Sequence, residues 1–106
     1  MMLEKLFKFT QTDGKIIEKV VSDENVRYNH MILPKGEGLP EHTSNSNLYM
    51  LVVRGTLSLR LSDQEEHKYP KGSLLKIPNK LVMNAYNTDE EVLEITVVKA
   101  PAPGTF

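Results

Sequence analysis

The stretch GEGLPEHTSNSNLYMLVVRG, residues 36–55, decides the fold of this chain. Glycines stand at both ends, at Gly36 and Gly55, and His42 lies between them. The run LYMLVV, residues 48–53, is continuously apolar, which is typical of a strand buried on both faces. Gly55 closely follows this run, and a glycine there lets the chain turn tightly into the next strand because it lacks a Cβ atom.

A second stretch, PKGSLLKIPNKLVMNAYN at residues 70–87, alternates turns with short strands. We expect turns at residues 70–72 and 78–80, because proline, glycine and asparagine favour turn geometries. Between the two stretches, the run TLSLRLS places its three leucines on one face of a strand. Further strand signals lie at residues 15–22, 26–33, 73–77, 81–86 and 91–98. Many short strands separated by such turns indicate an all-β sandwich or barrel.

Three segments are less regular. Residues 3–9 could form a short helix with Leu3, Leu6 and Phe7 on one side, or an edge strand. The segment DQEEH, residues 63–67, reads as a polar turn in which His67 is solvated. The tail, residues 100–106, contains two prolines and cannot continue a central strand, so we expect a loose or partner-contacting end.

Length and composition exclude several classes of protein. A chain of 106 residues corresponds to a single domain, residues 1–106, with one hydrophobic core. The formal net charge of -1 gives no general attraction to phosphate backbones, so we expect no nucleic-acid partner. We also expect no membrane partner and a cytoplasmic location, because no long apolar run or secretory signal is present. The absence of cysteine excludes disulfides and thiol chemistry.

Together the two stretches resemble the two motifs of the cupin family. The first cupin motif runs from a glycine through a His-x-His pair and a glutamate to a second glycine, and the second joins Pro-x-Gly to a later proline, histidine and asparagine. The positions that agree are Gly36, His42, Gly55, Pro70, Gly72, Pro78 and Asn87. The resemblance covers residues 26–101, with N-terminal strands expected within residues 1–25. It implies a small RmlC-like cupin, which is a single-domain double-stranded β-helix, or jelly-roll barrel.

The resemblance also implies where a metal would bind, and most of those ligands are replaced. Metal-binding cupins hold a divalent transition metal with three histidines and a glutamate that point into the barrel. The corresponding positions here are His42, Ser44, Leu48 and Met83. A hydroxyl is a poor ligand unless ionised, a thioether suits soft metals, and leucine offers no ligand atom. We therefore expect no metal site and no cofactor.

By the same resemblance, the residues at the mouth of the barrel are His42, Ser44, Leu48, Met50, Met83 and Asn87, and we predict that they bind a ligand. A mostly apolar set with a few polar groups is typical of a small-molecule pocket. Methionine side chains adapt to irregular ligands. The alternative is that these side chains simply fill the barrel, because small barrels can be packed solid.

A further histidine, His30, could supply a ligand from outside the motifs. The resemblance turns Met31 and Leu33 toward the interior of the barrel, and side chains alternate along a strand. His30 should therefore point outward, away from His42, as a surface or interface residue.

The sequence leaves the function open between two classes. The first hypothesis is a metal-free module that binds or senses a small molecule. The alternative is an enzyme that uses His42, either as a metal-dependent dioxygenase or isomerase or as a metal-free catalyst similar to sugar epimerases, with the histidine as base. The epimerase mechanism also needs a tyrosine acid, and strand parity turns Tyr49 and Tyr86 outward. Whether the protein is an enzyme is not decided by the sequence.

The N-terminal segment bears on association between chains. Cupins commonly dimerise through N-terminal strands, so the resemblance implies a homodimer. Apolar side chains for such a contact are Leu3, Leu6, Phe7 and Phe9. The same side chains could instead cover the barrel of their own chain.

Overall fold

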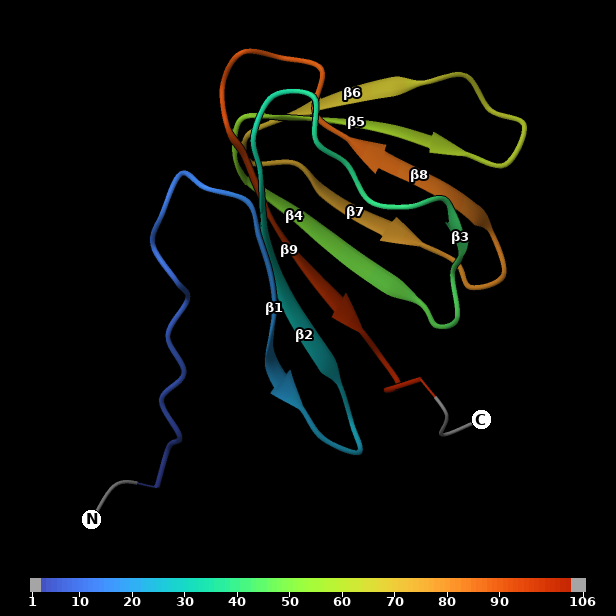
Figure 1. The fold of residues 1–106 in the computed structure, drawn as a ribbon. Helices are drawn as coiled ribbons and strands as arrows, with labels where there is room; N and C mark the ends of the chain where they lie inside the picture. Colours follow the sequence, from blue (N-terminus) through green and yellow to red (C-terminus); the bar gives the residue numbers. More distant parts are fainter. Residues whose placement is uncertain (1–2, 104–106) are drawn as a thin grey trace.

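The computed structural model describes residues 3–103, which form nine β-strands and no helix. The strands are β1 (Ile16–Ser22), β2 (Arg27–Leu33), β3 (His42–Thr43), β4 (Leu48–Arg54), β5 (Thr56–Leu61), β6 (His67–Pro70), β7 (Leu74–Ile77), β8 (Val82–Tyr86) and β9 (Leu93–Lys99). Figure 1 shows their arrangement. Within this part of the chain no helix is long and apolar enough to cross a membrane.

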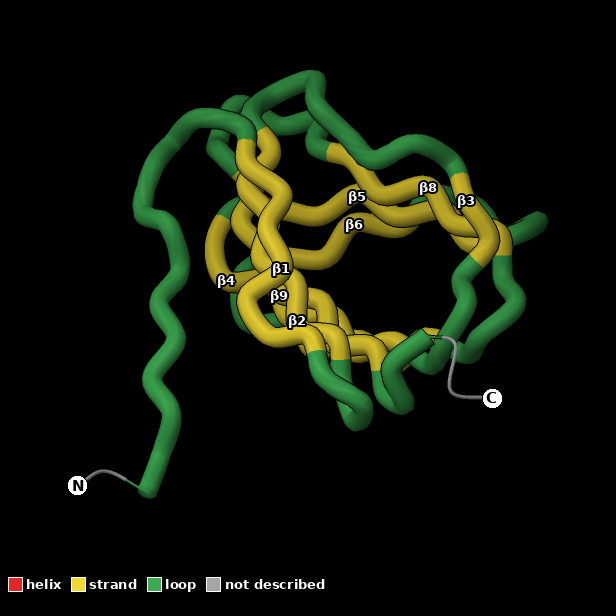
Figure 2. Tube along the Cα trace, turned by 60° about the horizontal axis from the view of Figure 1, so that its bottom comes forward, coloured by secondary structure: helices red, strands yellow, loops and turns green. Residues whose placement is uncertain are grey.

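The strands form two antiparallel sheets that face each other. The larger sheet has the order β1-β2-β9-β4-β7, and the smaller has the order β3-β8-β5-β6. Figure 2 shows the two sheets opposed, with the chain crossing between them at the ends of the strands. Apolar side chains from the inner faces of both sheets make one core. The predicted all-β barrel is confirmed.

The burial of β4 differs from the expectation for a continuously apolar run. Leu48, Met50 and Val52 are buried in the core, whereas Leu51 and Val53 on the opposite face are exposed. The prediction that this strand is buried on both faces was therefore wrong. In an antiparallel sandwich each sheet packs its inner face on the core and leaves its outer face open to solvent. A run of apolar residues does not reveal whether another segment covers that outer face.

The irregular segments also differ from their predicted structure. Residues 3–15 contain neither a helix nor a strand, and in Figure 1 this blue segment runs alongside β1. His67 is exposed, as expected, but it begins β6 and does not lie in a turn. The C-terminal tail is held down as far as it is described, because the amide of Ala102 donates to the carbonyl of Asn25 at 3.1 Å. Residues 104–106 of the predicted loose tail lie outside the described residues.

Gly55 makes the turn that the sequence assigns to it. Its φ is +79°, in the left-handed region that favours glycine. A Cβ atom at this position would lie 2.4 Å from the carbonyl oxygen of Val92. The residue therefore allows β4 to pass directly into β5 beneath the start of β9.

Asn87 and Ser44 hold the loops of the two motifs together through the backbone. The Asn87 amide donates from Nδ2 to the carbonyls of Leu33 and Glu91, both at 2.9 Å, and its Oδ1 accepts from the amide of Asp89 at 2.9 Å. Ser44 Oγ donates to a carbonyl at 3.1 Å and accepts from a backbone amide at 2.9 Å. Both side chains are buried. Their polar atoms satisfy backbone groups that would otherwise be buried without partners.

The Asn87→Ala substitution removes all three of its side-chain hydrogen bonds. We expect the free energy of unfolding to fall by about 2–4 kcal/mol, because the bonds are lost and buried backbone groups are left unpaired. Urea denaturation measures this change. The control Asn25→Ala lies at an exposed bend between β1 and β2 and should cost less than about 0.5 kcal/mol. Similar small losses in both variants would contradict the role of Asn87.

Candidate functional site

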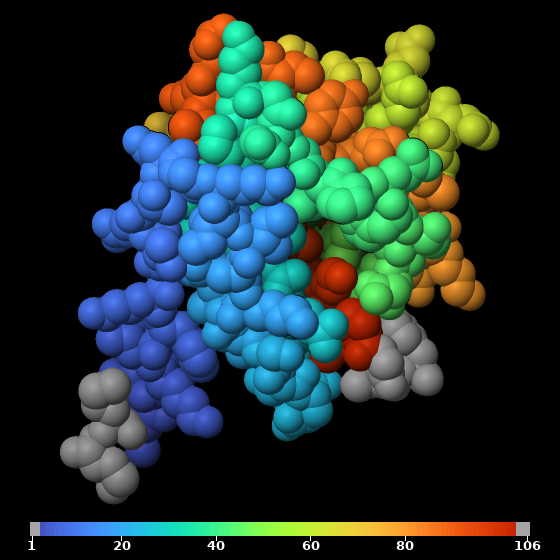
Figure 3. All heavy atoms as spheres, in the orientation of Figure 1, coloured from blue at the N-terminus to red at the C-terminus, as the bar shows by residue number. Residues whose placement is uncertain are grey.

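A cavity of about 330 Å³ opens at one end of the barrel, on the inner face of the larger sheet. Its lining residues are Ile17, Asn29, Met31, Leu39, Pro40, His42, Leu48, Met50, Met83, Val97 and Lys99. Figure 3 shows the surface hollowed between the blue strand β1 and the green segment before β4, with red atoms of β9 inside the hollow. The barrel is therefore not packed solid at this end.

The walls of the cavity are apolar because several strands turn the same face inward. Met50 and Val97 are direct cross-strand partners on β4 and β9. Met83 on β8 pairs with His42 on β3, on the opposite sheet. Three of the lining residues are methionines, whose unbranched side chains adjust to irregular shapes.

The polar groups of the cavity are His42, Asn29 and Lys99. His42 is exposed, and its Nδ1 lies 3.0 Å from the carbonyl oxygen of Pro40. A carbonyl only accepts, so in this contact Nδ1 carries the proton and Nε2 of the neutral ring is left as an acceptor. Asn29 is 8% exposed, and its Oδ1 is buried without a hydrogen-bond partner.

Lys99 is the charged group of the lining. Burial lowers the pKa of its ammonium, and the nearby positive charges of Arg27 and Lys19 lower it further. Its side-chain hydrogen bond runs from Nζ to Asn45 Oδ1 at 3.3 Å. The mouth of the cavity is thus positively charged.

The structure brings together four of the six predicted ligand-binding residues. His42, Leu48, Met50 and Met83 all line the cavity. Ser44 and Asn87 are not among the lining residues, and their polar atoms bind the backbone as described above. Spacing within a motif cannot show which partner a buried hydroxyl or amide takes.

Sequence reasoning missed Asn29 and Lys99. For Asn29 a signal was present, because it lies two residues before Met31, which the cupin resemblance turns inward, and alternation gives both residues the same face. Lys99 follows the apolar run of its strand and precedes the proline-rich tail, so its pattern resembles that of an ordinary solvated lysine. Only the pairing of β9 with β2 and β4 places it beside the cavity.

The residues present do not fit a cupin-type metal centre. Among residues 3–103 no group of three or more His, Asp or Glu side chains is placed to hold an ion. Of the four motif positions, Leu48 and Met83 are buried in the core and the Ser44 hydroxyl is bound to the backbone. His42 is left as the one effective nitrogen ligand of the motif set.

His30 lies on the opposite face of the larger sheet from the cavity. Its neighbours Asn29 and Met31 line the cavity, so alternation turns His30 outward, as predicted. The ring is nevertheless fully buried, which corrects the expectation of a surface position. Phe9 of the N-terminal segment stacks on it with ring centroids 4.3 Å apart. Its Nε2 lies 2.6 Å from Glu94 Oε2.

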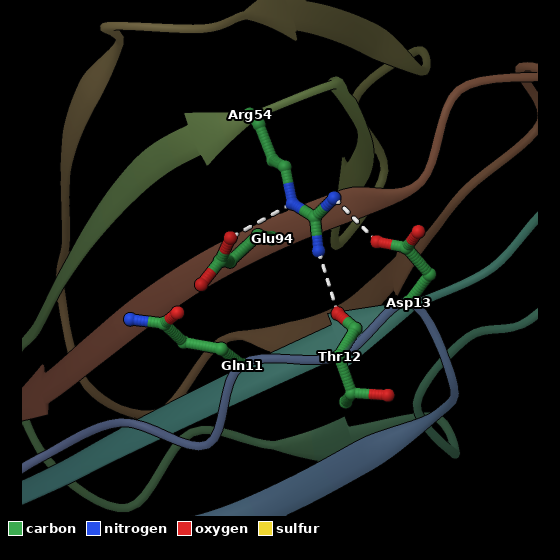
Figure 4. A pocket seen from close by; sticks show the side chains of 5 residues that line it. All are labelled: Gln11, Thr12, Asp13, Arg54 and Glu94. Carbon is green, nitrogen blue, oxygen red and sulfur yellow. Dashed lines mark hydrogen bonds and ion pairs between the residues drawn. The ribbon is translucent and has the colours of Figure 1, made fainter.

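Beside this buried histidine, a second hollow of about 410 Å³ is lined by Gln11, Thr12, Asp13, Arg54 and Glu94. Figure 4 shows Arg54 at its centre. The guanidinium donates to Glu94 Oε1, to Asp13 Oδ1 and to the carbonyl of Thr12, each at 2.8 Å. The planar guanidinium presents five N–H donors in a fixed geometry, so it can bridge several acceptors at once. The contacts fasten the N-terminal segment to β4 and β9.

Comparison with known proteins gives one strong relative. No protein-family model matches the chain. The sequence is 40% identical over 103 residues to an uncharacterized protein of Methanocaldococcus jannaschii, covering 96% of this chain and 89% of that protein. The crystal structure of an RmlC-like cupin family protein from the same organism matches with a TM-score of 0.91 and 39% identity, covering 95% of this chain and 94% of that one.

More distant structures share the fold. A cupin-like protein from Thermotoga maritima matches with a TM-score of 0.77 at 17% identity, covering 85% of this chain and 71% of that one. A cupin superfamily protein from Desulfitobacterium hafniense gives 0.74 at 11% identity, covering 88% and 83%. The two opposed sheets and the motif turns agree with the relatives from Methanocaldococcus jannaschii, which are 39–40% identical over nearly the whole chain. The chain therefore belongs to the RmlC-like cupin family and has its double-stranded β-helix fold.

Proposed function

We propose that this cupin binds a small organic molecule in the barrel cavity, without a bound metal, as a sensing or binding module. The observation that carries the proposal is the cavity itself. Its volume of about 330 Å³ lies at the lower end of the roughly 300–1,000 Å³ of known ligand pockets. Apolar walls with a few polar groups at the rim are the usual composition of such pockets.

The donor set supports a site without metal. A transition metal held at cellular concentrations needs several nitrogen or oxygen ligands in a defined geometry. Here the motif positions provide leucine and methionine side chains in the core and a serine whose hydroxyl is already bonded. These replacements favour contact with an organic molecule over coordination of an ion.

Catalysis by His42 is the alternative, and it has weaker support. The contact with Pro40 leaves Nε2 of a neutral ring as a possible base beside the cavity. Neither Tyr49 nor Tyr86 lines the cavity. The Tyr86 hydroxyl bonds to Glu66, and this contact raises the pKa of the phenol. A histidine–tyrosine pair of the epimerase type is therefore not assembled among the described residues.

Metal analysis tests the first part of this proposal. Protein purified without a histidine tag or added metal should contain well below one equivalent of any transition metal, because a single imidazole holds an ion weakly. Elemental mass spectrometry measures the content. A stoichiometric metal that is lost in the His42→Ala variant would overturn the proposal and favour a metal-dependent enzyme.

A cavity-filling substitution tests the second part. Val97→Phe places a ring in the cavity, so compounds that raise the melting temperature of the wild-type protein should lose that effect in the variant. The control Val53→Phe adds the same bulk on the exposed outer face of β4 and should leave the effect unchanged. Differential scanning fluorimetry against a metabolite library provides both readings. Hits that persist in Val97→Phe would bind elsewhere, and the absence of any hit would count against the proposal.

We also propose that two copies of the chain associate through the outer face of the larger sheet. Leu51 on β4 and Leu74 on β7 are cross-strand partners there, and Leu74 is 67% exposed. The N-terminal segment exposes its own apolar side chains, with Leu3 94% and Leu6 70% exposed. Contact between these surfaces in two copies would remove both from water.

The oligomeric state tests this association. We expect a dimer in sedimentation equilibrium at micromolar concentration, and Leu74→Lys should shift it toward monomer by placing a charge in the contact. The control Val82→Lys changes a residue of similar chemistry that is exposed on the smaller sheet, and it should leave the dimer intact. A monomeric wild-type protein, or a dimer insensitive to Leu74→Lys, would contradict the proposed interface.

A further inference from the structure

Three cations lie on the cavity side of the larger sheet, at its open end. Arg27 on β2 is the direct partner of Lys99 on β9, and Lys99 is in turn paired with the cavity residue Leu48. Lys19 on β1 is the direct partner of Asn29, another cavity residue. Side chains of directly paired residues in an antiparallel sheet share one face. The three positive groups therefore share the face of the sheet that carries the cavity, and Lys99 itself lines the cavity.

Within residues 3–103 these cations, Lys19, Arg27 and Lys99, form no ion pair with an aspartate or glutamate, although other lysines and Arg54 are paired. Arg27 Nε is buried without a hydrogen-bond partner. No aspartate or glutamate lines the cavity. Burial lowers the pKa of Lys99, and the nearby positive charges of Arg27 and Lys19 lower it further.

A second unsatisfied group points to a ligand independently of charge. Asn29 lines the cavity between the cations and the apolar wall, is more than nine-tenths buried, and has no partner for Oδ1. Buried side-chain acceptors are nearly always bonded in folded proteins. An amide left free at the wall of a cavity can accept a hydrogen bond from a hydroxyl or N–H group of a bound molecule.

Such an arrangement costs stability in the empty protein. Like charges close together and an unpaired buried acceptor both disfavour the folded state. Buried polar groups without hydrogen-bond partners are typically found at functional sites, where a ligand supplies the missing partners.

We propose that the cavity binds an amphipathic anion, with a carboxylate or phosphate head at Lys99 and Arg27 and an apolar body against Leu48, Met50 and Met83. A hydroxyl or N–H group near the head bonds to Asn29 Oδ1. This inference rests on the proposed function and adds the chemical class of its ligand. The anion offsets the repulsion among the three cations, so binding stabilises the protein most at low ionic strength.

The head group is tested with four compounds that share one phenyl body. Phenylacetate and phenyl phosphate carry an anionic head, 2-phenylacetamide is neutral, and phenethylamine is cationic. We expect at least one anion to bind about tenfold or more tightly than the amide, measured by titration calorimetry, because charge-assisted hydrogen bonds are stronger than neutral ones. The amine should not bind detectably. The ratio of phenyl phosphate to phenylacetate affinity distinguishes a phosphate head from a carboxylate head.

Charge substitutions locate the binding. Lys99→Gln and Arg27→Gln should each weaken binding of the better anion by about tenfold and reduce its dependence on salt. The control Lys71→Gln removes the same charge from the turn between β6 and β7, outside the cavity, and should change neither. Lys99→Gln should leave the melting temperature of the unliganded protein unchanged or higher, because it removes a buried and repelled charge. This reading excludes loss of binding through unfolding.

The outcomes separate this inference from the proposed function. Equal affinity for phenylacetate and 2-phenylacetamide, or unchanged anion affinity in Lys99→Gln, would overturn the anionic head. If library compounds that are neutral or cationic raise the melting temperature while neither anion binds, the cavity still binds ligands but of another class. If no compound of any charge stabilises the protein, both proposals fail.

Discussion

The central position of β9 is the constraint on which the rest of the structure depends. This strand is the last in the sequence, yet it lies between β2 and β4 and pairs with both along its length. It therefore joins the two halves of the larger sheet and buries its inner face in the core. The same pairing sets Arg27, Lys99 and Leu48 in one row, so the architecture and the charge of the cavity mouth have one cause. Removal of this strand would separate the sheet and open the cavity together.

The cavity has an apolar wall made by the replaced motif residues and a positively charged open end. Leu48 and Met83 stand where metal-binding cupins carry ligands, and here they make the apolar wall. Two of the three polar groups, Asn29 and Lys99, lie instead on strands outside the two motifs. Burial of the apolar wall stabilises the fold, so packing alone accounts for Leu48 and Met83. Partly buried charges without partners at the mouth destabilise it, so packing does not account for them. This contrast between wall and mouth supports a binding role for the mouth.

The outer face of the larger sheet has its own organisation. His30 is buried there by Phe9, and Glu94 bonds to both His30 and Arg54. Arg54 continues the network to Asp13 of the N-terminal segment. The segment therefore needs no regular secondary structure to be ordered, because polar anchors and one stacked ring fix it to the sheet. Its more distal apolar side chains remain exposed and available to a second copy.

The sequence by itself determined most of the strands and turns and the family, because alternation, glycine and proline act over a few residues and the two cupin motifs carry the spacing of the turns. The short strands β3 and β6 carry no such signal and were not predicted. The sequence also showed that the metal ligands are replaced, since Leu48 and Met83 offer no suitable nitrogen or oxygen atom. Only the tertiary structure decided what covers each face and which polar atoms meet. The burial of His30 and the placement of Lys99 beside the cavity both depend on contacts between segments far apart in the chain, which no local pattern encodes.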